Sequence, residues 1–153
     1  MESKLIFKQF DKSYINQLNE WQLQEQNQGN NDIEQFIMFQ DSQLGQTLHL
    51  ISTKTDIKTL LAFDQNDLIG FVCYDQKENG QYFIELMAVN PMFRGQNYSE
   101  QIINLLKEEL IKKPQFKSLA LSVDTKNIRA QKAFDKFAKN KNLNNNQYIE
   151  YEL

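Results

Sequence analysis

The stretch from Leu86 to Leu106, LMAVNPMFRGQNYSEQIINLL, constrains the fold of this chain more than any other segment. It predicts a β-strand, a tight polar loop and an α-helix, because an apolar run is followed by a polar segment and then by apolar residues at helical spacing. A loop that leads into a helix presents backbone N–H groups without acceptors, next to the positive end of the helix dipole. Such a loop is a typical site for a phosphate or diphosphate group.

This loop resembles the acetyl-CoA-binding signature of the GNAT superfamily, the amine N-acetyltransferases. Arg94 stands where that signature opens with Gln or Arg. Asn97 replaces the central Gly of the signature, and Ser99 replaces its last small residue, which is Gly or Ala in the family. After Gly, Asn is the residue that best tolerates a positive φ, so the turn is expected to survive this replacement.

A second segment, Leu119–Lys136, resembles the other signature of the family, in which a strand is followed by Asn, Ala, an aromatic residue and Lys at fixed intervals. Those positions are held here by Asn127, Ala130, Phe134 and Lys136. With both segments in place, the resemblance covers nearly the whole chain. It implies one N-acetyltransferase-like domain over residues 1–153 and acetyl-CoA as cosubstrate, without a metal. The implied reaction is direct attack by a primary amine, of a small molecule, peptide or protein, in a ternary complex.

Hydrophobic periodicity and turn residues predict the order of elements along the chain. Strands are expected at residues 4–10, 59–63, 68–74, 82–89, 119–123 and 148–153, and helices after residue 11 or 13, from Asp32, after the polar loop up to Pro114, and over 127–138. Residues 44–56 are ambiguous, and 139–147 predict a solvated loop. The order β-α-α-β-β-β-α-β-α-β predicts an α/β (α+β) fold of GNAT type, with a mixed, mostly antiparallel central sheet and helices on both faces.

The resemblance also implies where the cosubstrate lies. The backbone of Met87, Ala88 and Val89 is expected to pair with the pantetheine arm in a gap between the fourth and fifth strands, with the Val89 N–H near the thioester oxygen. The implied diphosphate cradle comprises Gly95, Gln96, Asn97, Tyr98, Ser99 and Glu100, with added charge from Arg94. Asn127 fits both a helix cap and a cofactor contact. Tyr98 fits both packing under the helix and contact with the ligand.

Glu85 is the candidate general base, because it is a charged residue inside the otherwise apolar strand segment 83–87. Alternation with a period of two predicts that it shares a face with Met87 and Val89. A carboxylate at that place can take a proton from the amine through water. A solvated glutamate at a strand edge fits the same position. Where some family members carry a carboxylate on the fifth strand, this chain has Ser122.

The general acid is missing from its usual place in the family. Phe134 stands where family members often have a tyrosine near the departing sulfur, and phenylalanine has no proton to give. The thiolate then leaves unaided or protonated by water, or another tyrosine such as Tyr148 substitutes. A weak or inactive relative that binds CoA or a protein partner is the alternative function. An unrelated α/β nucleotide binder is a third reading, disfavoured by the absence of Gly-rich Walker and Rossmann patterns.

Composition and net charge limit the classes of partner and the cellular location that we expect for this chain. The net charge of −3 argues against nucleic acid as a partner. No stretch reaches the ~20 apolar residues of a membrane span. The single cysteine, Cys73, lies in the apolar run 69–73 and predicts a buried free thiol. The start of the chain has no apolar core of signal-peptide type, so the cytoplasm is the expected location, for a monomer or a homodimer.

Overall fold

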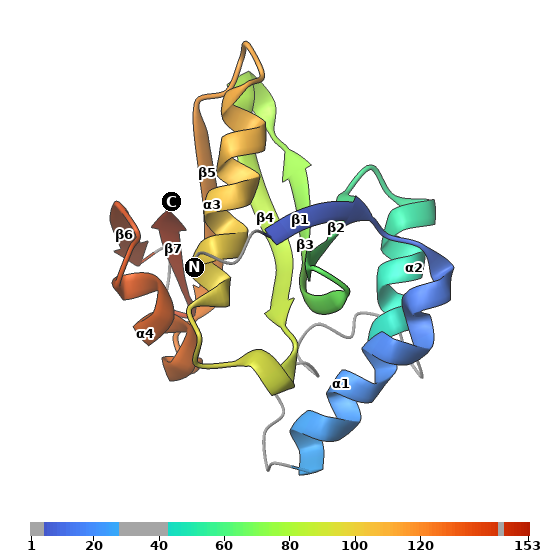
Figure 1. Cartoon of the computed structure of the whole chain (residues 1–153). Helices are drawn as coiled ribbons and strands as arrows, with labels where there is room; N and C mark the ends of the chain where they lie inside the picture. The colour runs from blue at the N-terminus through green and yellow to red at the C-terminus, as the bar shows by residue number, and fades with distance from the viewer. Residues whose placement is uncertain (1–4, 28–42, 144–145) are drawn as a thin grey trace.

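The computed structural model describes residues 5–27, 43–143 and 146–153. The helical pattern predicted from Asp32 lies outside these residues. Within them, seven strands form one sheet in the order β1-β2-β3-β4-β5-β7-β6 (Figure 1). Neighbouring strands are antiparallel except for β4 and β5, which run parallel. The predicted fold class and the mixed, mostly antiparallel sheet are therefore confirmed.

Most elements have bounds close to those of the predicted segments. The strands are β1 (Leu5–Gln9), β2 (Lys58–Asp64), β3 (Asp67–Gln76), β4 (Gln81–Val89), β5 (Ser118–Asp124), β6 (Asn140–Leu143) and β7 (Tyr148–Glu152). The helices are α1 (Ile15–Asn27), α2 (Leu44–Lys54), α3 (Tyr98–Ile111) and α4 (Ile128–Asp135). The ambiguous residues 44–56 thus contain helix α2. No helix among the described residues has the length and apolar content needed to cross a membrane.

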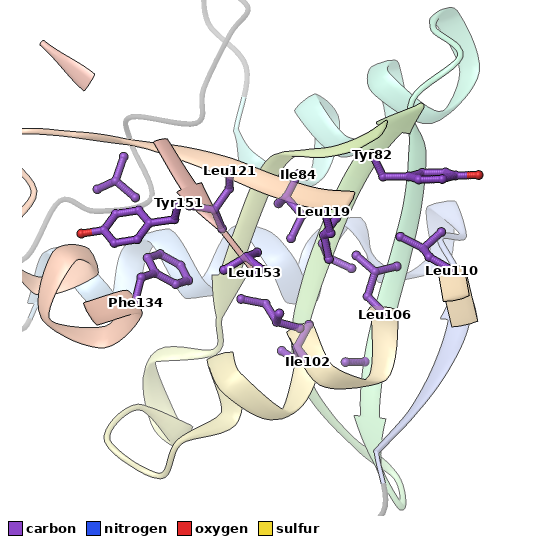
Figure 2. Packing of buried hydrophobic residues seen from close by; sticks show 14 of the residues in the cluster. Tyr82, Ile84, Ile102, Leu106, Leu110, Leu119, Leu121, Phe134, Tyr151 and Leu153 are labelled. Carbon is purple, nitrogen blue, oxygen red and sulfur yellow. The ribbon is translucent and has the colours of Figure 1, made fainter. Parts of the chain in front are cut away.

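Two hydrophobic cores hold the helices against opposite faces of the sheet (Figure 1). On one face, α1 and α2 bury Leu18, Trp21 and Leu48, and the ring of Trp21 stacks on Phe71 of β3 with centroids 6.3 Å apart. On the other face, α3 packs through apolar side chains onto the middle of the sheet. The labelled members of that cluster are Tyr82, Ile84, Ile102, Leu106, Leu110, Leu119, Leu121, Phe134, Tyr151 and Leu153 (Figure 2).

Two predictions for the C-terminal part of the chain are wrong. Helix α4 ends at Asp135, not at residue 138. Beyond it, the N–H groups of Phe137 and Ala138 both donate to the Phe134 carbonyl, at 3.2 and 2.9 Å, and form a closing turn. The predicted loop 139–147 contains strand β6. All four residues of β6 are exposed, and the strand exists through its backbone pairing with β7. An edge strand without a buried face has no hydrophobic alternation that could predict it.

Candidate functional site

A cavity of about 690 Å³ opens between β4, β5, α4 and the loop that precedes α3. Strands β4 and β5 pair in parallel only from Gln81–Ser118 to Ile84–Leu121. Beyond these pairs β4 and β5 no longer pair with each other. There, residues 85–89 of β4 and 122–124 of β5 line the cavity. This opening is the gap that the resemblance implied between the fourth and fifth strands.

The hydrogen bonds of β4 decide which backbone groups face this gap. The N–H of Asn90 donates to the Ile69 carbonyl of β3 at 2.7 Å. Bonded and non-bonded residue pairs alternate along an antiparallel ladder. In the β3–β4 register, Met87 and Val89 therefore direct their N–H and C=O groups away from β3 and toward β5. Ala88 directs its backbone N–H and C=O to β3, but the residue lines the cavity, so its contact with the cosubstrate stays a prediction.

Glu85 lies in a β-bulge of β4. Tyr74 of β3 pairs with Ile84, and Cys73 pairs with Leu86, so Glu85 has no partner residue on β3. A bulge places two residues of one strand opposite a single residue of its neighbour, and it commonly redirects a side chain beside a functional site. Glu85, which carries the carboxylate of this strand, is therefore the extra residue of the bulge.

The bulge interrupts the alternation of side chains at Glu85. Ile84, Met87 and Val89 pack in the core under α3, whereas Leu86 packs in the core under α1 and α2. Ile84 thus shares a face with Met87 and Val89, although three residues separate it from Met87, because the extra residue of the bulge shifts every side chain that follows it. The face that Glu85 shares with Met87 and Val89 stays a prediction. Glu85 lines the cavity, as a general base must.

The Glu85 carboxylate is half-buried and forms an ion pair. Its Oε1 lies 3.1 Å from Nζ of Lys77, and the same ammonium lies 3.3 Å from the Asp75 carboxylate. Hydrogen bonds to Glu85 and then to Asp75 raise the pKa of Lys77. Burial raises the pKa of the nearby Cys73 thiol to about 12, and the charge of Glu85 adds to this rise. The predicted buried free thiol is confirmed.

The loop before α3 has the backbone geometry of an anion cradle. Gly95 and Asn97 both have positive φ angles, +82° and +63°. An added Cβ at Gly95 would meet no atom within 4 Å, so its φ, not a lack of space, favours glycine here. The first backbone bond of α3 runs from the Gln101 N–H to the Asn97 carbonyl, at 3.3 Å. The N–H groups of the first turn therefore have no acceptor within the helix. The predicted tolerance of positive φ at Asn97 is confirmed.

All the loop residues predicted to hold the diphosphate line the cavity except Gln96. Those that do are Arg94, Gly95, Asn97, Tyr98, Ser99 and Glu100. The Tyr98 ring packs edge-on against Phe93 with centroids 6.0 Å apart, and its hydroxyl donates to the Asp64 carboxylate at 3.3 Å. The side chain of Tyr98 is thus held under the helix, and its contribution to a cradle comes from its backbone N–H.

Helix α4 supplies the wall opposite this loop. The Asn127 Oδ1 accepts the Ala130 N–H at 3.1 Å, which confirms the predicted helix cap. Asn127 also lines the cavity, so its contact with a cofactor stays a prediction. Phe134 lines the cavity too, but only 7% of it is exposed, and its ring packs against Tyr151 with centroids 5.6 Å apart (Figure 2).

Among the described residues, no tyrosine hydroxyl replaces the missing acid. Tyr148 pairs with Asp124 at the end of β5 and does not line the cavity. The tyrosine that does line it, Tyr98, donates its hydroxyl to Asp64. Ser122 lines the cavity with an exposed side chain, but a hydroxyl group is not a base at neutral pH.

Sequence reasoning missed two cationic residues of the cavity wall, Arg129 and Lys132 on α4, and assigned no role to a third, the signature residue Lys136 at its C-cap. Their spacing of three and four residues is the signal that indicates a shared helix face. Together with the anion cradle and the exposed backbone of β4, they fit a long ligand that has an amide-bearing arm at one end and phosphate groups at the other. The residues present therefore fit the cosubstrate that the resemblance implies.

Comparison with known proteins places this geometry in a family. A sequence profile described as the acetyltransferase (GNAT) family matches residues 15–138. A search of curated protein sequences finds no match. The fold is similar to that of the acetyltransferase from Salmonella typhimurium that modifies the N-terminal serine of ribosomal protein L7/L12. The two share 15% identity with a TM-score of 0.74, over 99% of this chain and 95% of that chain.

Two further solved structures have the same fold. An acetyltransferase from Thermus thermophilus matches with a TM-score of 0.74 at 11% identity, over 100% of both chains. The acetyltransferase AAC(6')-Ib, in complex with paromomycin and acetyl-CoA, matches with a TM-score of 0.69 at 12% identity, over 97% of this chain and 92% of that chain. At these identities the likeness establishes the shared fold.

Proposed function

Because this chain belongs to the acetyltransferase (GNAT) family, and is thus an N-acetyltransferase that uses acetyl-CoA, we propose that it acetylates a primary amine by direct attack within a ternary complex, with Glu85 as general base. The acceptor is a small molecule or an amine of a peptide or protein. The observation that carries the proposal is the position of Glu85 in a bulge at the edge of the β4–β5 gap. Its carboxylate lies at the cavity, where an incoming amine would lose its proton.

The proposed cosubstrate site extends along the whole cavity. When bound, acetyl-CoA supplies the thioester whose acetyl group is transferred. The N–H and C=O groups of Met87 and Val89, which face the gap, hold the amide-bearing arm as an added strand would be held. The loop from Arg94 to Glu100 holds the diphosphate through backbone N–H groups at the start of α3. Asn127 caps α4 and fixes the opposite wall.

Three roles follow for residues at the reacting end. The Val89 N–H donates a hydrogen bond where negative charge develops on the thioester oxygen. The Glu85 carboxylate accepts a proton from the amine, directly or through one water molecule. No side-chain acid is proposed for the departing thiolate, because Phe134 has no proton and the Tyr98 hydroxyl is engaged by Asp64. A thiolate is a far better leaving group than an alkoxide, so it can leave as its anion and take up a proton from water afterwards.

The proposed location is the cytoplasm, and its support comes from Cys73. The thiol is free and buried. A free thiol is compatible with a reducing compartment, where disulfides are rare. Expression with a fluorescent tag, followed by fractionation, tests the location directly.

Two measurements test the proposed function in sequence. Acetyl-CoA or CoA should raise the melting temperature, whereas ATP and NAD should not; a ligand at ~100 times its dissociation constant stabilises a protein by roughly 2.7 kcal/mol. A panel of primary amines, including polyamines, aminoglycosides and peptides, is then screened for release of the CoA thiol. The absence of a thermal shift at millimolar CoA would contradict the proposed cosubstrate site. Binding without thiol release from any amine would favour the alternative of a CoA-binding protein without turnover.

A further inference from the structure

The ammonium group of Lys77 contacts Glu85 from outside the cavity. Its Nζ lies 3.1 Å from Oε1 of Glu85, yet Lys77 is not among the residues that line the cavity, whereas Glu85 is. Among the residues that the structure describes, Lys77 is also the one hydrogen-bond and ion-pair partner of the Glu85 carboxylate. Lys77 thus occupies one carboxylate oxygen from the side of the β3–β4 connection and leaves Oε2 available to a group in the cavity.

A second carboxylate restricts the position of the lysine. Nζ of Lys77 lies 3.3 Å from Oδ2 of Asp75, near the end of β3. Hydrogen bonds to Glu85 and then to Asp75 raise the pKa of Lys77, so its ammonium group stays charged at neutral pH. An ammonium group has three donors and serves both acceptors at once. An amide oxygen at position 75 would serve as well, since this contact needs only an acceptor.

The backbone that carries Lys77 is fixed at the β3–β4 connection. The Lys77 N–H donates to the Gln81 carbonyl at 2.6 Å. Gly80 has a φ of +77°, and an added Cβ there would collide with the backbone carbonyl oxygen of Gln115. The Gly80 carbonyl accepts the Lys117 N–H at 2.9 Å. The connection is therefore packed against the segment between α3 and β5, which fixes the backbone position of the lysine.

Glu85 depends on such a contact because it lies in the bulge. The residue has no partner on β3, so no directly opposite side chain sets its direction. A half-buried glutamate without a fixed contact samples several rotamers, whereas a general base must lie within hydrogen-bond reach of the proton that it takes. We propose that Lys77 is a positioning residue for acetyl transfer: its ammonium group holds Oε1 of Glu85 and presents Oε2 to the amine. The inference rests on the proposed function, because it takes Glu85 as the general base.

A double-mutant cycle tests whether Lys77 acts through Glu85. Turnover is measured with the amine that releases most CoA thiol in the screen. Lys77→Met should lower the turnover number roughly 10-fold, less than Glu85→Gln does, because the carboxylate remains and still samples the productive position. The KM for acetyl-CoA should change by less than about 2-fold. In the Glu85→Gln background, Lys77→Met should have no further effect, since the two substitutions remove one shared function.

Two control variants separate the contact with Glu85 from a general effect of charge or fold. Lys77→Arg keeps a cation with hydrogen-bond donors and should recover part of the turnover lost in Lys77→Met. Lys112→Met removes a lysine from another exposed ion pair, 3.8 Å from Glu109 and outside the cavity, and should leave turnover unchanged. An equal loss from Lys77→Met in both backgrounds would assign the lysine to the stability of the hairpin and overturn the inference. Full turnover in Lys77→Met would overturn it as well.

The order of the Glu85 side chain provides a readout that needs no acceptor. NMR relaxation of its methylene groups is compared in the wild type, Lys77→Met and Lys112→Met. The order parameter should fall in Lys77→Met alone, because only this variant frees the carboxylate. Equal order parameters in all three proteins would overturn the inference. Wild-type turnover in Glu85→Gln, or no thiol release with any amine, would instead contradict the proposed function.

Discussion

Nζ of Lys77 lies 3.1 Å from Oε1 of Glu85, at the point where β4 has one residue more than β3. The same ammonium lies 3.3 Å from Asp75, so one lysine bridges two carboxylates. Only one of the two, Glu85, lines the cavity. The pair of carboxylates therefore provides a matched test: both contact Lys77, but only Glu85 is within reach of a substrate in the cavity.

Glu85→Gln should lower turnover by ~10²–10⁴-fold, because the amide keeps the shape of the side chain and loses its basicity. The affinity for acetyl-CoA should stay nearly unchanged, since the proposed cosubstrate site consists of backbone groups and cations elsewhere in the cavity. Steady-state kinetics with an identified amine and a CoA titration check the two parts separately. Asp75→Asn is the control and should retain turnover. Wild-type turnover in Glu85→Gln at every pH would leave Glu85 a structural residue of the bulge.

Asn97 has a φ of +63° immediately before α3, and this predicts opposite effects of two substitutions. Asn97→Gly should preserve both stability and CoA affinity, because glycine adopts this angle without strain. Asn97→Val should cost about 1–2 kcal/mol of unfolding free energy and weaken CoA binding, because a β-branched residue is strained there. Urea denaturation and CoA titration measure the two effects. Unchanged CoA affinity in a folded Asn97→Val variant would place the diphosphate away from this loop.

Phe134→Tyr should fold and raise the turnover number. The ring of Phe134 borders the cavity, so a hydroxyl directed into the cavity can reach water or the departing sulfur. If the hydroxyl instead meets the packed carbon of Phe137 and Tyr151, it should cost ~1–3 kcal/mol of stability. Melting temperature and turnover are measured together. Lower stability with no gain in turnover would mean that Phe134 is a core residue and that the thiolate leaves without an acid.

The buried thiol of Cys73 should make the protein less stable at alkaline pH. Burial raises its pKa from 9.0 to about 12 in the folded chain. The unfolded chain thus releases this proton at lower pH than the folded chain does. The corresponding stability is fully present below pH 9 and is lost as pH rises from 9 toward 12, by at most ~1.4 kcal/mol per pH unit. Denaturant unfolding from pH 8 to 11 should show a steeper decline for wild type than for Cys73→Ala, and parallel declines would refute this.

Local patterns in the sequence determined much of the site. The strand, the polar loop and the helix of residues 86–106 follow from short-range rules, namely hydrophobic periodicity, turn chemistry and the tolerance of Asn97 for positive φ. The same rules predicted the cap at Asn127 and the buried thiol of Cys73. These features depend on residues within a few positions of each other, so one sequence is sufficient to predict them.

The tertiary structure alone decided the features that depend on register between distant strands. The bulge at Glu85 exists only because Tyr74 and Cys73 of β3 pair with Ile84 and Leu86 of β4. The same register turns the backbone of Val89 toward the gap and that of Ala88 away from it. A one-residue shift between strands reverses every such assignment, and no local pattern encodes the shift. Strand β6 depends likewise on its pairing with β7, and the place of Arg129 and Lys132 in the cavity wall depends on the packing of α4 against distant segments.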